Sequence, residues 1–249
     1  MFATKGFVVK GNVMKQTQKT LLLTGLLFAQ ASSCFAIPTT DMFGSWNALT
    51  LQGDFKALSP DLDKVKWLVM NQARTRDDSA KNSRLSENLL FAQVGYQVNP
   101  NVSFWLGYAH EWLHPLNKSA YQENRAYQDF VWNETTGDFK WISRTRMEER
   151  VNATTGDVGY RPRQLLQVNY SLGFVEGLSA YVGDEVFFYV NKNKFGKKGF
   201  TENYIFSGLS YQASEHIGAD LGYMGQYIDN IKGNNLFTHN VQFNLRYQF

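Results

Sequence analysis

Cysteine is nearly absent from this sequence of 249 residues, which contains only Cys34. A single cysteine excludes a disulfide framework within the chain. Cys34 also lies in an N-terminal stretch that has the pattern of a cleavable export signal. Without that stretch, the mature chain would hold neither a thiol nucleophile nor a thiolate ligand for a metal.

Long hydrophobic runs are lacking as well. A membrane-spanning helix needs about 20 consecutive apolar residues, and no segment of the chain approaches that length. The apolar segment at residues 21–29 follows a short basic stretch and precedes small residues that end at Ala36. This order predicts a signal peptide at residues 14–36, cleaved between Ala36 and Ile37.

The extreme N-terminus allows more than one interpretation. Residues 1–13 are either an over-long basic region of the signal or sequence translated upstream of a true start at Met14. Residues 31–34 partly fit a lipoprotein box, but the leucine expected three residues before Cys34 is absent. After the signal, we expect residues 37–249 to form a single domain.

The mature chain has almost no net charge once the signal is removed. The full chain has 25 basic and 22 acidic residues, but residues 1–36 contain four lysines and no acid. The mature chain therefore has 21 basic and 22 acidic side chains. This balance removes the compositional argument for nucleic-acid binding.

Alternation of apolar and polar residues is the clearest pattern that is present. Every second residue from Val241 to Phe249 is apolar or aromatic, and the residues between them are polar. Successive side chains of a strand point to opposite faces, so such a segment has one apolar face. Residues 102–109 and 217–224 show a similar pattern. Roughly 9 to 11 such residues can cross a bilayer as a tilted strand.

Alternating runs recur along the whole mature chain. The links between them alternate in length, with tight turns at residues 99–101, 135–137, 173–177 and 213–215. Longer polar links occur at 77–87, 113–120, 152–159, 191–199 and 229–235. We count eleven runs, centred near Leu49, Val69, Val94, Leu106, Tyr127, Arg144, Leu166, Asp184, Ser207, Leu221 and Leu245.

These features predict an all-β fold, an antiparallel transmembrane β-barrel with short periplasmic turns and longer extracellular loops. Because single-chain bacterial barrels have even strand numbers, we expect about 12 strands, with ten as the alternative. A soluble β-sandwich or lipocalin-like barrel also has alternating strands. The export signal and the last strand favour the membrane barrel, and Tyr247 and Phe249 are the expected signal for the outer-membrane assembly machinery.

Several phrases from Leu90 onward carry a family resemblance. They are Val94-Gly95-Tyr96, Asn99-Pro100-Asn101, Trp105-Leu106-Gly107-Tyr108, the segment from Arg144 to Arg150, the segment from Asp184 to Phe188, and Gly222-Tyr223-Met224. In order and spacing they resemble the outer-membrane family known as domain of unknown function 2490. The resemblance implies a barrel in the outer membrane of a Gram-negative bacterium and implies no reaction. Tyr204 stands where the family pattern suggests an arginine.

The sixth run carries the densest charge. Arg144, Arg146, Glu148 and Arg150 share one face, and arginines facing hydrocarbon would each cost roughly 2 to 4 kcal/mol at the bilayer midplane. We therefore expect that face to point into the lumen. The predicted lumen cluster is Arg144, Arg146, Glu148, Arg150, Arg163, Glu185, Asp220 and Arg246. Strict alternation would turn Asp184 toward lipid, unless a bulge or register change near Gly183 prevents it.

No catalytic, cofactor-binding or metal-binding set is evident. His110 beside Glu111, with His114 nearby, is the one candidate for a hydrolase site, but adjacent strand residues face opposite ways. No spacing suggests a metal site or a phosphate-binding glycine loop. The lysines of residues 191–199 could contact lipopolysaccharide phosphates or form an ordinary solvated loop.

Three functional classes remain open. The first is a narrow channel for small solutes, which we favour, and the second is a structural or surface-interaction barrel with a plugged lumen. The third and weakest is an outer-membrane hydrolase. A pore needs a continuous wet path, and an enzyme needs a converging base and nucleophile. The expected partners are outer-membrane lipid and lipopolysaccharide, the assembly machinery and small solutes.

We expect the mature protein to begin at Ile37 and to contain no thiol, because Cys34 leaves with the signal. N-terminal sequencing and the intact mass of protein from isolated outer membranes measure this directly. Retention of residues 14–36, or a lipid attached to Cys34, would contradict the prediction.

Overall fold

The computed structural model describes residues 39–77, 83–114, 119–229 and 234–249. The predicted signal and its cleavage point between Ala36 and Ile37 lie outside these residues. The described chain forms eleven strands and one 3-10 turn, Pro60–Leu62. The strands are β1 (Thr39–Asp54), β2 (Val65–Asp77), β3 (Ser83–Asn99), β4 (Val102–Leu113), β5 (Tyr121–Thr136), β6 (Phe139–Asn152), β7 (Val158–Ser171), β8 (Leu178–Tyr189), β9 (Gly199–Gln212), β10 (Ile217–Ile228) and β11 (Asn235–Gln248).

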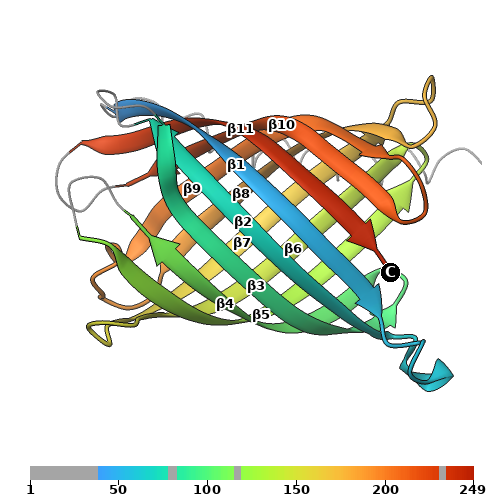
Figure 1. Ribbon diagram of the computed structural model, residues 1–249, viewed down its shortest axis with the longest axis horizontal. Coiled ribbons are helices and arrows are strands. Elements are labelled where there is room, and N and C mark those ends of the chain that lie inside the picture. Colours follow the sequence, from blue (N-terminus) through green and yellow to red (C-terminus); the bar gives the residue numbers. More distant parts are fainter. Residues whose placement is uncertain (1–38, 78–82, 115–118, 230–233) are drawn as a thin grey trace, which may run out of the picture. The chain divides into compact units, whose positions relative to one another are not determined.

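The strands form one closed barrel in which each pairs with its neighbours in sequence (Figure 1). These sequential pairs are antiparallel, whereas β1 and β11 close the barrel as a parallel pair from Thr39↔Asn235 to Gln52↔Gln248. The all-β barrel is confirmed, and all eleven predicted runs fall within strands. Eleven strands are close to the expected number of about 12. The number is odd, not even as expected, because the closing pair is parallel. No described helix is long and apolar enough to cross a membrane.

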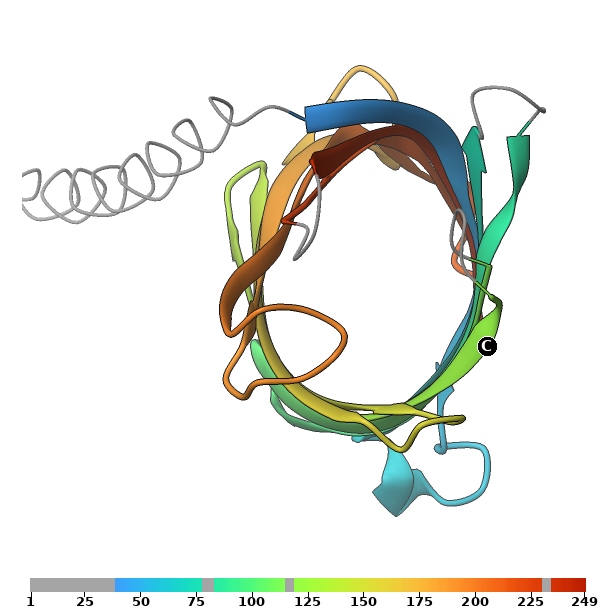
Figure 2. The same cartoon turned by 90° about the vertical axis from the view of Figure 1, so that its left-hand side faces the viewer.

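The strands enter and leave the barrel at two ends, which are named here by the links found there. The tight turns after β3, β5, β7 and β9 lie at one end, called the turn end here, together with the ten-residue link between β1 and β2. The C-terminal ends of β2, β4, β6, β8 and β10 lie at the opposite end, the loop end, which faces the viewer in Figure 2. Because β1 and β11 are parallel, β1 begins at the loop end and β11 ends at the turn end.

The outer surface is apolar along the middle of many strands. Leu106, Leu221 and Val241 face outward and are 65%, 60% and 61% exposed. Aromatic side chains gather on this surface toward both ends. Ring pairs include Phe104–Phe130, Phe139–Tyr170 and Tyr247–Phe249 toward the turn end, and Phe43–His239 and Phe188–Phe200 toward the loop end. An apolar band between two aromatic zones is the pattern of a barrel that meets lipid.

Asp184 is an exception on this outer surface. It is paired in register with Leu166 and Ile205, and the irregularity of β8 lies between Phe187 and Phe188, not near Gly183. Strict alternation therefore holds, and the suggested bulge or register change near Gly183 is wrong. The Asn203 side chain on β9 donates a hydrogen bond of 2.9 Å to the Asp184 carboxylate, which partly offsets the cost of placing this group outward.

Inward-facing aromatic rings lie against glycines of the neighbouring strand. The directly opposed pairs are Gly95↔Trp105, Gly107↔Tyr127, Gly183↔Phe206 and Gly208↔Tyr181. A Cβ atom added at Gly107 would lie 2.3 Å from Cζ of Tyr127. The missing side chain thus lets the ring lie flat on the barrel wall, which keeps it out of the centre of the lumen.

Substituting Gly107→Ala should destabilise the folded barrel by roughly 1 to 3 kcal/mol, because the buried Tyr127 ring must move to admit a methyl group. Urea unfolding of the purified protein in detergent, followed by tryptophan fluorescence, measures the change. Gly173→Ala is the matched control, since nothing lies within 4 Å of a Cβ atom at Gly173. Equal stability of the two variants would contradict the role assigned to Gly107.

Candidate functional site in the barrel lumen

A cavity of about 810 Å³ occupies the interior of the barrel. Along β1 its wall extends from Thr40 near the loop end to Gln52 near the turn end. At about 3.3 Å per residue, this corresponds to roughly 40 Å of tilted strand. The cavity therefore follows most of the length of the barrel.

Glu148 on β6 is the centre of the first ion-pair network. Its fully buried carboxylate accepts hydrogen bonds from Arg161 at 2.9 and 2.7 Å and from Arg163 at 2.6 Å. The Arg146 guanidinium lies 3.7 Å away. Arg146, Glu148, Arg161 and Arg163 come from β6 and β7, where alternation turns them to the same face. Three guanidiniums thus surround one carboxylate.

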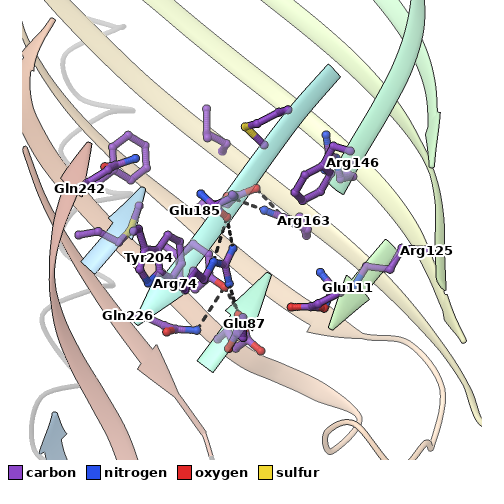
Figure 3. A pocket seen from close by; sticks show the side chains of 18 of the residues that line it. Arg74, Glu87, Glu111, Arg125, Arg146, Arg163, Glu185, Tyr204, Gln226 and Gln242 are labelled. Carbon is purple, nitrogen blue, oxygen red and sulfur yellow. Dashed lines mark hydrogen bonds and ion pairs between the residues drawn. The ribbon is translucent and has the colours of Figure 1, made fainter. Parts of the chain in front are cut away.

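Glu185 on β8 extends this network. Arg163 donates to its two carboxylate oxygens at 3.0 and 2.9 Å (Figure 3), and Arg144 donates to it at 2.8 Å. Arg146 completes the network on the other side through two bonds of 2.6 and 2.7 Å to Asp129 on β5. Such two-point arginine–carboxylate pairs fix the orientation of both groups.

A second network lies nearer the loop end. The fully buried Glu123 accepts hydrogen bonds from Arg150 at 2.6 to 2.9 Å and from Arg125 at 3.1 and 3.2 Å. Arg125 also pairs with Glu111 on β4. On the neighbouring wall, Arg74 of β2 donates to Glu87 of β3 at 2.6 Å.

Aromatic rings hold several of these arginines. The Arg146 guanidinium lies 3.8 Å from the centre of the Tyr127 ring, and that of Arg74 lies 3.7 Å from the Trp46 ring. Stacking on a ring leaves the edge of a guanidinium, with its N–H groups, free to point elsewhere. These rings therefore pack against the arginines and also orient them.

The charges are arranged in layers. Nine arginines line the cavity in the described part of the chain: Arg74, Arg76, Arg125, Arg144, Arg146, Arg150, Arg161, Arg163 and Arg246. The acidic residues that line it with them are Glu87, Glu111, Glu185 and Glu202. Glu123, Asp129 and Glu148 are at most 3% exposed and are not among the residues that line the cavity. The surface that a solute would meet is therefore more positive than the lumen as a whole.

The opposite wall, formed by β10, β11 and β1, is largely uncharged. Thr50, Gln226, Gln242 and Asn244 line the cavity there. Figure 3 shows Gln226 and Gln242 across the pocket from Arg125 and Arg146. Amide and hydroxyl groups on this wall can both donate and accept hydrogen bonds.

The loop after β8 folds over part of the mouth at the loop end (Figure 2, orange). Phe195 of this loop lines the cavity, and the Arg150 guanidinium lies 4.7 Å from the centre of its ring. Lys194 pairs at 2.9 Å with Asp157 of the neighbouring loop. The hydrogen bond from the Thr155 hydroxyl and the adjacent Lys194 ammonium lower the pKa of Asp157, so this contact keeps its charge at neutral pH.

The structure brings most of the predicted lumen residues together. Five of them, Arg144, Arg146, Glu148, Arg163 and Glu185, lie in the first network, and Arg150 lies in the second. Asp220 and Arg246 form a pair of their own, to which Ser210 and Asn244 are hydrogen-bonded. Sequence reasoning did not assign to the lumen Arg74, Arg76, Glu87, Glu111, Glu123, Arg125, Asp129, Arg161 and Glu202. Arg161 shares a face with Arg163, and Glu123, Arg125 and Asp129 share a face with Tyr127, so alternation could have identified them.

The other singled-out residues do not form a reactive site. His110 faces away from the lumen and contacts Asn124 at 2.8 Å and Gln122 at 3.1 Å, whereas Glu111 points inward to Arg125. Tyr204 is buried in the barrel, where its ring lies 5.1 Å from that of Trp46. No group of three or more His, Asp or Glu side chains able to hold a metal occurs among the described residues.

Fold and interior together define a closed β-barrel with an arginine-rich, ion-paired lumen. The chain belongs to the family described as protein of unknown function (DUF2490), whose model matches residues 43–237. This confirms the resemblance seen in the sequence. The chain is also similar to an uncharacterized protein from Methylorubrum extorquens, with 30% identity over 149 residues that cover 58% of this chain. It spans 64% of that relative, less than two thirds of its length.

Replacing Glu148 by alanine should destabilise the barrel by roughly 3 to 5 kcal/mol, because Arg161, Arg163 and Arg146 would lose a shared buried partner. Urea unfolding in detergent measures this. Glu149→Ala is the matched control, since the neighbouring Glu149 is exposed and an exposed substitution should change stability by about 0.5 kcal/mol or less. A similarly small effect of Glu148→Ala would show that the network contributes little.

Proposed function

We propose that this protein is an outer-membrane β-barrel of a Gram-negative bacterium that lets small polar solutes pass through its lumen. The outward-facing apolar band and the aromatic zones at both ends support a membrane location. The predicted signal at residues 14–36 and a last strand that ends in Phe249 support export and assembly in the outer membrane. In this orientation the turn end is periplasmic and the loop end is extracellular.

The observation that carries the channel assignment is the cavity that extends from Thr40 to Gln52 along β1. The two networks around Glu148 and Glu123 lie against the wall of β4 to β8, and stacking on Tyr127 and Trp46 holds Arg146 and Arg74 to the wall. The glycine–aromatic pairs keep rings out of the centre in the same way. Space for a wet path is therefore preserved beside a dense charge network.

A plugged structural barrel is the second candidate, and the buried networks around Glu148 and Glu123 favour it. Networks of this kind can hold a narrow barrel shut as well as line a path. The two candidates differ in whether ions cross the purified protein.

Surface partners follow from the proposed location. Lys192 and Lys198 are exposed on the loop after β8, at the end that we assign to the cell surface. There they would meet the phosphate groups of lipopolysaccharide, which lysines bind as point charges.

Planar-bilayer recording tests the channel directly. The wild-type protein should conduct potassium chloride, and Phe195→Ala should increase the single-channel conductance, because the Phe195 ring lines the cavity at its mouth. Phe174→Ala is the control, since Phe174 lies in the tight turn after β7 and is 78% exposed. Silence of the folded wild type and of Phe195→Ala would overturn the channel and support the plugged barrel.

A further inference from the structure

The charged groups on the cavity surface favour anions over cations, a preference that a general channel does not require. Nine arginines line it together with four glutamates. Carboxylates such as Glu148 and Asp129 balance the charge of the fold, but they are buried and do not line the cavity. A solute in the lumen thus meets guanidinium edges first, and these attract anions and repel cations.

Arg144 is the arginine best placed to bind a solute. Its side chain is 26% exposed, more than that of Arg146 at 6% or Arg163 at 10%. It donates one hydrogen bond to Glu185, and its Nε atom is buried without a hydrogen-bond partner among the described residues. Glu185 keeps two bonds from Arg163 without it. Arg144 therefore has donors that the ion-pair network does not use.

The opposite wall adds a second recognition element. The Oε1 atom of Gln242 is buried without a hydrogen-bond partner in the described part of the chain, and Gln242 lines the cavity. An amide oxygen accepts hydrogen bonds from O–H or N–H groups and repels an anion. On a solute that carries an anionic group for the arginines, a hydroxyl group can supply this donor. Gln226 and Asn244 line the same wall.

We infer that the lumen is a binding site for small hydroxylated organic anions, whose carboxylate or phosphate group binds Arg144 and whose hydroxyl groups face Gln242. Guanidinium groups match both kinds of anion through paired hydrogen bonds. The volume of about 810 Å³ is within the range of small-molecule sites. This inference rests on the proposed function in that the site lies on the solute path.

Calorimetric titration of the purified barrel in detergent tests binding without relying on conductance. Gluconate and inorganic phosphate should bind, gluconate should bind more tightly than phosphate, and uncharged glucose should bind far more weakly than gluconate. Arg144→Gln should weaken gluconate binding about tenfold, the size expected for one lost charge-assisted hydrogen bond. Arg144→Lys should retain part of the affinity. Lys56→Gln, which removes one charge from the exposed link between β1 and β2, should leave the affinity unchanged.

Bilayer recordings across a potassium chloride gradient supply an independent measurement. The wild type should prefer chloride over potassium, gluconate should block the current, and Arg144→Gln should reduce both effects. If Arg144→Gln does not fold, the ion selectivity of the wild type and its relative affinity for gluconate and glucose still test whether the lumen binds anions. Anion binding without conductance would overturn the channel but retain the anion site. Conductance with cation preference, or gluconate affinity equal to that of glucose, would overturn the anion site but retain the channel.

Discussion

Hydrogen bonds between β1 and β11 close the sheet, and every feature of the interior depends on that closure. A closed sheet has no free edge, and alternate side chains of every strand then face a common lumen. Charged residues that would cost free energy in contact with lipid can therefore face one another inside. The parallel geometry of this one pair also allows an odd number of strands and places the start of β1 and the end of β11 at opposite ends of the barrel.

Confinement explains the form of the charge network. In a narrow space each guanidinium needs a carboxylate partner, and Glu148, Glu123 and Glu185 each bind more than one arginine. Aromatic rings and glycines of neighbouring strands keep the side chains flat against the wall. The result is a cavity beside the network whose exposed layer is richer in arginine than the lumen as a whole. A structural need, the neutralisation of buried charge, thus produces a surface suited to anions.

Much of the fold could be predicted because strand alternation is a local property of the chain. The eleven runs, the alternation of tight and long links and the apolar outer face could all be read from neighbouring residues. The number of strands could not be predicted in this way, because whether it is even or odd depends on how the first and last strands pair to close the barrel. In this chain closure depends on a contact between Thr39–Gln52 and Asn235–Gln248, almost two hundred residues apart in sequence.

The sequence by itself determined which faces of the strands are polar, and hence that Arg144, Arg146, Glu148 and Arg150 share one side. Only the tertiary structure decided which charges meet. Glu148 pairs with Arg161 and Arg163 because β6 and β7 are in a particular register, and Asp184 points outward because β8 stays regular at Gly183. Register and closure arise from hydrogen bonds between strands that are distant in sequence. The residue pattern of a single strand therefore carries the direction of each side chain but not the identity of its partner.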